Sequence, residues 1–578
     1  MTFFSKKKVS CLMAAGILFG CLLWAACTIT VTGDDGSVWV QVNRDGFGNR
    51  DNFSVVAMAA YQDALYAMTR NEDKGAEVWK YDGSDWEQVL FPGGEKNGIY
   101  GNENINNVWG RMIVFNSKLY FGFSSGLQGN YLNSTGCEIW RYDGSSWEAV
   151  ISDERDTDAS GTITAISGCA ADDGATTAVI TDSSQSWTVD EWAGGTLQIT
   201  SGDGIYRKFY IIGNTADSLT IQQNETAGTG ADAASETEYT VCEAAEYNNP
   251  YPLYSYTLGE VEEGDTFTIG MGFDESGFGE IWNKTITDMT LYNGNLYVST
   301  GLNYDYGAQI WSSEDGDTWT VTEPANSFGN YHAGTANYPG GEKPVSSSLT
   351  SMAVFNDTLY AGGTGTTGLS GSCSRMAILT ETGWELIVDS AIDANDNGTN
   401  ENGFGDGMDC DMDTGNFMPW NLTVFNEKLF AGINSLGGLR ILYTTTGTAD
   451  DDAWSYSVGG DAVLPPGFND LRSNPTWGHD NIAPNLFEFN NELYAGAVTL
   501  YIPEYGATNT NGAHIWKTGN GIDWTRVTGN GFNDNEVIIF EAFAEYDGHL
   551  YVSASKGASS TPEGLGGAMV YRLETPGS

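Results

Sequence analysis

The stretch MAVFNDTLYAGG, residues 352–363, indicates a β-hairpin. Apolar residues alternate on both sides of Asn356-Asp357, and such a pair between two alternating runs is typical of a two-residue hairpin turn. The same pattern recurs along the chain, each time with a leucine followed by an aromatic residue in the second strand. These pairs are Leu65-Tyr66, Leu119-Tyr120, Leu296-Tyr297, Leu359-Tyr360, Leu429-Phe430, Leu493-Tyr494 and Leu550-Tyr551.

The spacing of these hairpins indicates a ring of repeats. Most successive copies stand roughly 60 residues apart, and the gap between Leu119 and Leu296 is more than 100 residues longer. In most units a second hairpin follows the first, as in AEVWKYDGSDWEQV at residues 76–89, which gives four strands, A to D. Repeats of this size cannot bury a core alone and stack around an axis. We therefore predict an all-β fold, a seven-bladed β-propeller.

The two ends of the chain are expected to share one blade. The last unit has a strand C at residues 568–573 and no strand D after it. Residues 37–42, SVWVQV, form a lone alternating strand that resembles strand D of the first unit, DWEQV at 85–89. The sequence therefore predicts a propeller over 37–159 and 260–574, closed by its N-terminal strand. Closure removes the exposed edges of an open array.

The repeats resemble two known families. YDGSDW at residues 81–86, YDGSSW at 142–147 and Gly362-Gly363 resemble kelch repeats, and SEDGDTW at 313–319 resembles an Asp-box hairpin that is one residue short. The resemblance implies a β-propeller. It implies no activity, because both families occur in binding modules and in enzymes.

Residues 1–27 resemble a bacterial lipoprotein signal. Three lysines precede an apolar run at 9–26, and Ala25-Ala26-Cys27 matches the end of a lipobox, with Trp24 where leucine is usual. We expect lipidation at Cys27, with ordinary secretory cleavage or an uncleaved anchor as alternatives. Each of these places the mature chain outside the cytoplasm, at the cell envelope, on the outer membrane or the cell surface.

The long gap holds an insertion at residues 160–242, which the alternation at 178–221 predicts to be a small β domain. Cysteines lie near both of its ends. In an oxidising compartment Cys169 and Cys242 are a candidate disulfide, with two buried thiols as the alternative. Cys373 and Cys410 are a second candidate pair, which leaves Cys137 buried at the start of a strand.

The composition limits the partners of the chain. The formal net charge is −51 over 578 residues, and the acidic residues are spread along the chain. Such a surface repels nucleic acid and anionic membranes, so we expect no nucleic-acid partner and no membrane contact beyond the N-terminal anchor. We expect a monomer that binds a glycan or a protein.

Loop lengths indicate which face binds. The A–B turns have two residues, whereas the B–C and D–A loops on the opposite face are long. Binding residues concentrate on long loops held by a rigid scaffold. Aromatic side chains there suit stacking on sugars or anchoring a protein, with capping of blade ends as the alternative role. The aromatic candidates that we select are Trp109, Tyr304, Tyr306, Trp420, Trp477 and Tyr501.

A Phe-Gly turn often follows strand D, as at Gly46-Phe47-Gly48, Gly277-Phe278-Gly279, Ser327-Phe328-Gly329, Gly403-Phe404-Gly405 and Gly531-Phe532-Asn533. Its recurrence indicates a structural role. We predict that the phenyl ring packs between blades and that glycine permits positive φ.

The acidic run at residues 393–413 is a candidate calcium site. Alternating side-chain oxygens before a tight bend suit a hard cation, and Phe404 stands where the helix-loop-helix calcium pattern requires a carboxylate. The alternative is a solvated acidic loop. The candidate ligands are Asp393, Asn395, Asn397, Glu401, Asp409, Asp411 and Asp413.

No catalytic motif stands out. The four histidines form no closely spaced pair for zinc, and no nucleophile elbow or phosphate loop occurs in a usable context. Arg111 and Asp288 begin inner strands and are expected to face the central channel with Asn421, Asn485 and Glu541. This is a mixed polar lining, not the arginine cluster of a sialidase.

The sequence therefore favours an exported, lipid-anchored propeller that binds a glycan or protein without catalysis. The alternative is a glycan-cleaving enzyme of sialidase or lyase type with its site in the central channel. Besides the aromatic candidates, the expected ligand-binding residues are Arg111, Asp288 and Asn421. No cofactor is expected other than calcium.

Overall fold

The computed structural model describes most of the repeats and part of the insertion. The described residues are 8–11, 27–71, 75–90, 109–124, 136–152, 159–168, 177–193, 196–202, 208–222, 245–248, 255–258, 261–270, 276–279, 283–301, 308–322, 345–366, 374–388, 404, 418–435, 437–448, 453–460, 462–469, 481–499, 512–556 and 567–574. Across these ranges the chain is built from β-strands with a few short 3-10 turns, and no helix in them has the length and hydropathy to cross a membrane.

Within the described ranges, five separate sheets each contain four antiparallel strands that follow one another in the chain. Every strand pairs with the next, as the two successive hairpins of each repeat predict. The strands are β4 (Ser54–Tyr61), β5 (Ala64–Arg70), β6 (Val78–Tyr81), β7 (Trp86–Leu90); β8 (Arg111–Phe115), β9 (Lys118–Phe123), β10 (Glu138–Tyr142), β11 (Trp147–Ile151); β21 (Thr285–Tyr292), β22 (Asn295–Gly301), β23 (Ile310–Ser313), β24 (Thr320–Val321); β25 (Val345–Phe355), β26 (Thr358–Thr366), β27 (Ser374–Thr380), β28 (Gly383–Val388); and β29 (Met418–Phe425), β30 (Lys428–Asn434), β31 (Arg440–Thr444), β32 (Trp454–Val458).

A larger sheet holds the rest of the ring. It joins two meanders, β33–β36 and β37–β39, through a single pairing of Val498 with Ile539, and it continues from β39 into β3, β2 and β1. Its strands are β33 (Asn481–Phe489), β34 (Glu492–Thr499), β35 (Ile515–Thr518), β36 (Thr525–Thr528), β37 (Ile539–Tyr546), β38 (His549–Ser555), β39 (Met569–Glu574), β3 (Val38–Gln41), β2 (Cys27–Thr32) and β1 (Lys8–Cys11).

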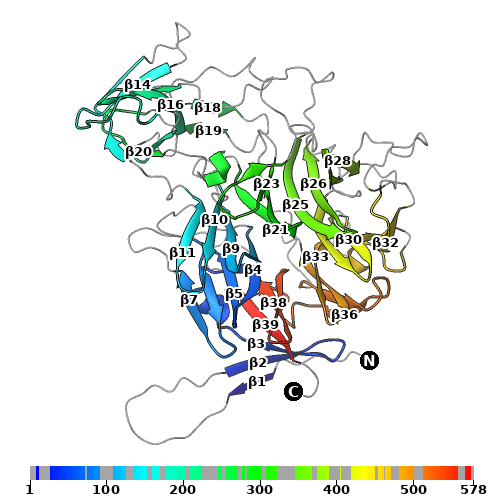
Figure 1. Ribbon diagram of the computed structural model, residues 1–578. Helices are drawn as coiled ribbons and strands as arrows, with labels where there is room; N and C mark the ends of the chain where they lie inside the picture. Colours follow the sequence, from blue (N-terminus) through cyan, green and yellow to red (C-terminus); the bar gives the residue numbers. More distant parts are fainter. Residues whose placement is uncertain are drawn as a thin grey trace, which may run out of the picture.

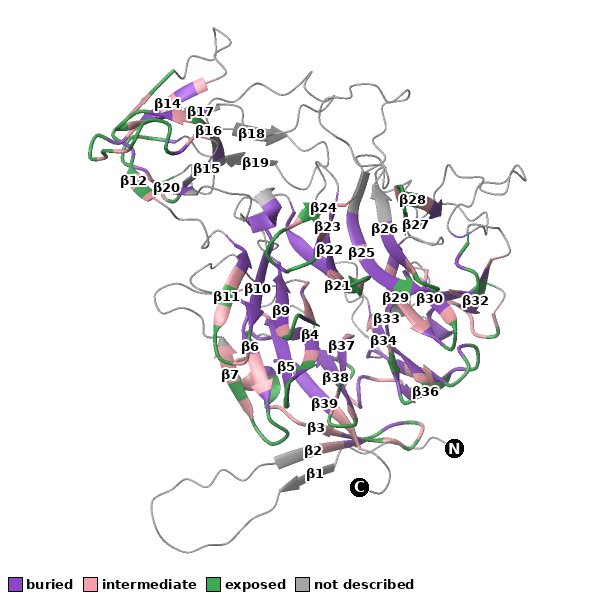
Figure 2. Cartoon of the chain, in the orientation of Figure 1, coloured by how far each residue is buried: buried purple, intermediate pink, exposed green. Residues whose placement is uncertain are grey.

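The first strands of the meanders contact one another in a cycle. In the part of the chain that the structure describes, the contacts run from β4 through β8, β21, β25, β29 and β33 to β37, and β37 contacts β4 again. Figure 1 shows the sheets arranged around this centre. Burial follows the same arrangement, because the second strand of each meander is largely buried and the turns are exposed (Figure 2). The fold is all-β and propeller-like.

The N-terminal strand lies where the sequence predicts it. β3 pairs antiparallel with β39, and Trp39 stands opposite Leu573. The Trp39 side chain is fully buried, with its ring 5.3 Å from that of Phe532. The termini therefore meet in one sheet (Figure 1).

The A–B turns adopt the backbone that their residues favour. Asn356 and Asp357 have φ of 48° and 57°, the left-handed pair of a type I′ turn, whose twist matches that of the flanking strands. Asn490 and Asn491 repeat this geometry at 51° and 58°. Asparagine and aspartate reach this region at lower cost than most residues, which explains why they mark the repeats.

The phenylalanine of the Phe-Gly turn packs into the following sheet, as predicted. Phe278 stacks on Trp311 at 4.6 Å and meets Trp319 edge-on at 5.5 Å. Gly277 and Phe278 both have left-handed φ, 68° and 59°. That backbone costs energy at a phenylalanine, and the contact with two tryptophans offsets it.

The same arrangement recurs around the ring. Phe47 packs on Trp79 and Trp86. The sequence analysis missed one copy, Phe468, which packs on Trp516 and Trp524 from the turn η5 (Pro466–Asn469). The predicted copy at Phe328 lies outside the described residues. The turns that contain Phe47 and Phe278 are η1 (Asp45–Gly48) and η4 (Ser276–Gly279).

The insertion forms a separate seven-stranded sheet with its own apolar core. It lies apart from the ring (Figure 1). The sheet includes the strand at 266–270, which pairs on both sides, so the insertion extends beyond residue 242, where the sequence placed its end, and the ring resumes later than residue 260. Its strands are β12 (Ala159–Thr162), β13 (Ala165–Ser167), β14 (Thr177–Thr181), β15 (Thr196–Ile199), β16 (Lys208–Asn214), β17 (Ser218–Gln222) and β20 (Thr266–Gly270); β18 (Ala245–Asn248) pairs with β19 (Ser255–Leu258).

Of the predictions about cysteines, the structure tests only the one for Cys137. Cys137 is a buried free thiol directly before β10, as expected, and burial raises the pKa of that thiol. The two candidate disulfides, Cys169–Cys242 and Cys373–Cys410, lie outside the described residues.

Trp39 tests the closure of the ring. We expect Trp39→Ala to lower the free energy of unfolding by about 3–5 kcal/mol, because it leaves a large void between sheets. The loss should appear as a lower melting temperature of the main calorimetric transition. Val38→Ala on the same strand is the control, since Val38 is 38% exposed and should change stability little. A W39A variant that melts like the wild type would contradict a closing role for β3.

Candidate functional site

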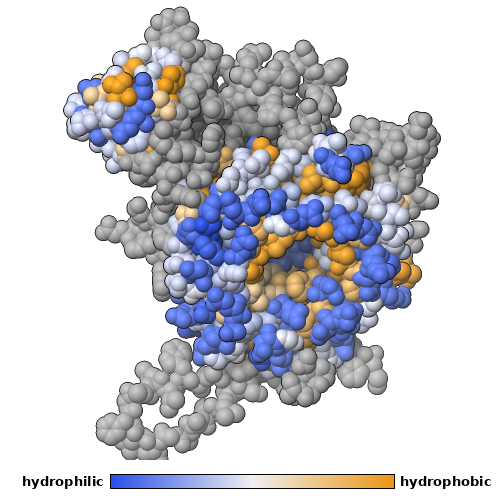
Figure 3. All heavy atoms as spheres, in the orientation of Figure 1, coloured by the Kyte–Doolittle hydropathy of each residue, from blue (hydrophilic) through white to orange (hydrophobic). Residues whose placement is uncertain are grey.

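A cavity of about 190 Å³ lies where the inner strands meet. Its walls come from residues of these strands that precede the A–B turns, and the described lining includes no residue of those turns. The cavity therefore lies away from the A–B turns. Figure 3 shows one face of the molecule hollowed at its centre, with apolar surface around the hollow and a hydrophilic rim.

One register position recurs in this lining. Every inner strand has a bulky apolar residue at the same place, and we call the residue immediately before it the clasp position. The apolar residues are Met58, Met112, Met289, Met352, Leu422, Leu486 and Phe543. The clasp positions are Ala57, Arg111, Asp288, Ser351, Asn421, Asn485 and Ala542.

Polar side chains at the clasp position bind the next strand. Asp288 Oδ2 accepts a hydrogen bond from the Met352 N–H at 2.6 Å. Ser351 Oγ accepts one from the Leu422 N–H at 2.8 Å, and Asn421 Oδ1 accepts one from Leu486 at 3.2 Å. These groups hold the inner strands together, since a buried N–H without an acceptor is costly.

The preceding position is occupied in a similar way in three strands. The hydroxyls of Thr287 and Thr350 donate to main-chain carbonyls of the next inner strand, at Leu349 and Pro419. Trp420 Nε1 donates to Asn485 Oδ1 at 3.0 Å. Much of the polar lining is therefore committed to the structure of the ring.

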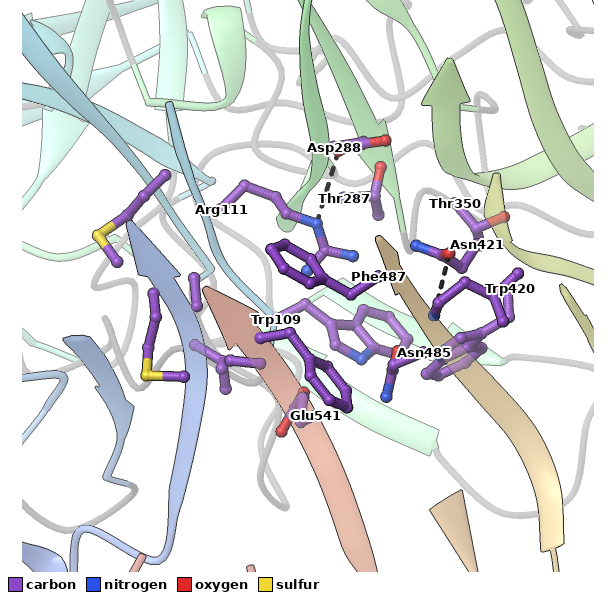
Figure 4. A pocket seen from close by; sticks show the side chains of 17 residues that line it. Trp109, Arg111, Thr287, Asp288, Thr350, Trp420, Asn421, Asn485, Phe487 and Glu541 are labelled. Atoms are coloured by element: carbon purple, nitrogen blue, oxygen red, sulfur yellow. Dashed lines mark hydrogen bonds and ion pairs between the residues drawn. The ribbon is translucent and has the colours of Figure 1, made fainter. Parts of the chain in front are cut away.

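Arg111 and Asp288 form an ion pair in the cavity. Arg111 Nε lies 3.7 Å from Asp288 Oδ1, and the side chains are 32% and 17% exposed (Figure 4). Burial raises the pKa of the Asp288 carboxyl, while Arg111 and the backbone N–H groups of Met352 and Met289 act in the opposite direction. The N–H groups bind both carboxylate oxygens, which restricts the movement of this side chain.

Of the two described acidic residues that line the cavity, Glu541 makes fewer hydrogen bonds to the ring than Asp288 does. It accepts a hydrogen bond from Ser54 Oγ at 2.6 Å. Burial raises the pKa of Glu541, against the lowering effects of Ser54, Arg70 and Arg111. A buried carboxyl with a raised pKa can hold a proton nearer neutral pH and release it there, which is the property required of a general acid or base.

Aromatic side chains complete the cavity. Trp109, two residues before β8, and Trp420, in β29, meet edge-to-face with ring centroids 6.1 Å apart. Phe487 stacks on Phe543 at 5.9 Å. Figure 4 shows both tryptophans at the cavity with Arg111, Asn485 and Glu541. Aromatic faces beside polar groups suit a ring-shaped ligand with one apolar face, such as a sugar.

The structure thus brings together five predicted polar residues of the channel. Arg111, Asp288, Asn421, Asn485 and Glu541 all line the cavity. Of the aromatic candidates, Trp109 and Trp420 lie there as well. Tyr304, Tyr306, Trp477 and Tyr501 fall outside the described residues, as do all the predicted metal ligands, Asp393, Asn395, Asn397, Glu401, Asp409, Asp411 and Asp413. The described residues contain no group of three or more His, Cys, Asp or Glu side chains placed to hold a metal ion.

Two features escaped the sequence analysis. Ser54 was not recognised as the partner of Glu541, because it belongs to the first inner strand and Glu541 to the last. The clasp contacts of Asp288 and Asn421 were also missed. Aligning the strands on their shared apolar residue would have shown that most clasp positions carry polar residues in an otherwise buried strand, a signal of a role in the ring.

Comparisons with known proteins find no family for this chain and match only distant solved structures. No protein-family model matches the chain, and no curated protein matches it by sequence. An ulvan lyase of polysaccharide lyase family 25 is 9% identical with a TM-score of 0.39, covering 92% of this chain and 94% of its own. A β-1,3-galactosidase of glycoside hydrolase family 43 is 13% identical with a TM-score of 0.28, covering 50% and 91%. Sqt1 of Saccharomyces cerevisiae is 10% identical with a TM-score of 0.36, covering 93% and 100%.

The raised pKa of Glu541 gives a test by pH. The unfolded chain releases this proton near the ordinary glutamate pKa, whereas the folded chain retains it to higher pH. Ionisation in the fold therefore costs stability above the ordinary pKa, and the cost grows until the folded pKa is passed. We expect Glu541→Gln, which keeps an acceptor for Ser54, to gain stability relative to the wild type as pH rises from 4 to 8.

The measurement is urea denaturation of both proteins at each pH. Glu545→Gln is the control, because Glu545 lies on the same strand and is exposed. A difference between E541Q and wild type that stays constant with pH would contradict the raised pKa.

Proposed function

We propose that this protein cleaves a glycan, and that one sugar residue of the substrate binds in the central cavity. The proposal is carried by the convergence of Glu541, Arg111, Trp109 and Trp420 on one cavity inside the ring. This is the enzyme alternative that the sequence analysis kept open.

The tryptophans position the sugar. The apolar face of the ring stacks on Trp420 or Trp109. The Trp420 indole N–H donates a hydrogen bond to Asn485 Oδ1, which fixes the indole ring. Fixing the sugar beside the acid lowers the entropic part of the barrier. The aromatic walls also exclude water, which strengthens electrostatic interactions inside.

Glu541 exchanges the proton. In its protonated form it gives a proton to the glycosidic oxygen as the bond from that oxygen to the sugar carbon breaks, and Ser54 holds the carboxyl in place. A water molecule bonds to that carbon and gives a proton to the Glu541 carboxylate. Asp288 is held by backbone N–H groups through both oxygens, so its carboxyl group keeps a fixed orientation beside the cavity.

A second candidate function is binding without cleavage, the main expectation from the sequence. One observation favours it: glycoside hydrolysis ordinarily requires two working carboxyl groups, and Asp288 is already engaged in holding β25. In that case Glu541 would serve as a hydrogen-bonding group for the ligand.

The two candidates differ in turnover. The full chain is screened on a panel of polysaccharides for new reducing ends and for unsaturated products. For an enzyme, E541Q should lower kcat by about 10²–10⁴-fold while substrate still binds, and W420A should weaken binding. E545Q on the same strand should change neither quantity. Binding without products in the wild type would establish the second candidate, and an E541Q variant with normal kcat would exclude Glu541 as the acid.

We further propose that the cycle of inner strands is a seven-bladed propeller of kelch or Asp-box type. The ten-stranded sheet then counts as two blades joined by one pairing. The repeated leucine–aromatic hairpins support this count. In this arrangement β3 is strand D of the last blade, in line with its pairing to β39.

We also propose that the propeller is tethered to the cell envelope by lipid on Cys27. The support is the lipobox-like Ala25-Ala26-Cys27 after a basic start and an apolar run. Cys27→Ser should abolish incorporation of labelled palmitate in an expressing bacterium and release the chain from the membrane fraction. Unchanged labelling would contradict the proposal. Calcium at residues 393–413 remains a proposal with its own measurement, a lower melting temperature in chelator.

A further inference from the structure

Arg111 is the cation of the cavity. Among the described lining residues it carries the single positive charge. Its Nη1 donates to the Gly110 carbonyl at 2.9 Å, and its Nε lies 3.7 Å from Asp288 Oδ1. Among the described residues Nη2 makes no hydrogen bond, and the guanidinium also interacts electrostatically with Glu541. About a third of the side chain is exposed, and Figure 4 shows it extending among the cavity residues.

Asp288 does not depend on Arg111 for its hydrogen bonds. Its oxygens accept from the N–H groups of Met352 at 2.6 Å and Met289 at 2.9 Å. The separation from Arg111 Nε exceeds the ordinary hydrogen-bond range. The ion pair is therefore loose, and the guanidinium can turn an edge toward a ligand while Asp288 keeps its place in the ring.

The surroundings of Arg111 favour an anion beside it. Arg111 is the one cation among the described lining residues, and its neighbour Asp288 already accepts hydrogen bonds from two backbone N–H groups. A guanidinium binds carboxylate and sulfate groups through two parallel N–H donors, an arrangement that a neutral hydroxyl cannot match.

We propose that the cavity selects an acidic sugar residue, whose carboxylate or sulfate ester binds Arg111 while the sugar ring stacks on Trp420. The inference rests on the proposed glycan function and names its substrate class. The net charge of −51 opposes anions at long range, so recognition depends on the contact inside the cavity. At about 0.15 M salt, exposed charges beyond roughly 8 Å are largely screened, and this contact dominates.

The test is calorimetric titration of the full chain at that salt concentration. Three matched ligands are used: a uronate oligosaccharide, its carboxyl-reduced neutral form, and a sulfate ester of that neutral form. We expect at least one acidic form to bind about tenfold more tightly than the neutral one. Arg111→Gln should remove this preference, measured as the ratio of the affinity for the acidic form to the affinity for the neutral form. The tighter of the two acidic ligands identifies the anionic group.

Two variants keep the result interpretable. Arg526→Gln makes the same charge change outside the cavity, where Arg526 pairs with Asp34, and should keep the preference. Arg111→Lys retains the charge without the guanidinium fork and should lose most of the preference even if R111Q folds poorly. Equal binding of acidic and neutral forms, or a preference that survives R111Q and R111K, would overturn the inference. If neutral glycans bind and W420A abolishes that binding, the proposed glycan function stands without the selection of acidic sugars. If no saccharide binds, both the glycan function and this selection are overturned.

Discussion

The antiparallel pairing of β3 with β39 ties the two ends of the chain into one sheet, and the rest of the ring depends on it. Through this pairing Trp39 enters the same position that Trp86, Trp319 and Trp524 occupy in other sheets, beside the phenylalanine of a Phe-Gly turn. The contact between β37 and β4 then completes the cycle of inner strands. Without the contact between β37 and β4, the inner strands would not surround a common centre and no central cavity would form.

The cavity shows how one set of polar residues serves the ring and the site together. At the clasp position a side chain that accepts a neighbour's N–H stabilises the ring, and Asp288, Ser351 and Asn421 do this. Arg111 cannot accept a hydrogen bond, so at its position the pattern is interrupted. Arg111 therefore does not bind the next strand, and its charged donor group lies beside the cavity. The same reasoning applies to Glu541, which stands where Thr287 and Thr350 donate to carbonyls of the next strand.

Local sequence patterns predict most of the fold. Turn residues such as Asn356-Asp357 demand a left-handed backbone, and alternating strands demand a buried face, so the hairpins, the four-stranded sheets and the polar channel residues could be predicted from sequence. The extent of the insertion could not be predicted, because nothing in the local sequence of residues 266–270 indicates that they pair with residues 159–162 and 196–199. The meeting of Trp109 with Trp420 was equally hidden, since it depends on curvature accumulated over several sheets. Pairings between distant segments are set by the assembled ring and have no local signature.

The place of β39 has a consequence for how the chain matures. β39 follows the other described strands of the ring in the chain, so β3 can pair with it only after those strands have been synthesised. Long-range pairings of this kind form slowly, because the loop between them must close first. Until this pairing forms, β39 has an unpaired edge, so the closure of the ring is one of the last steps of folding.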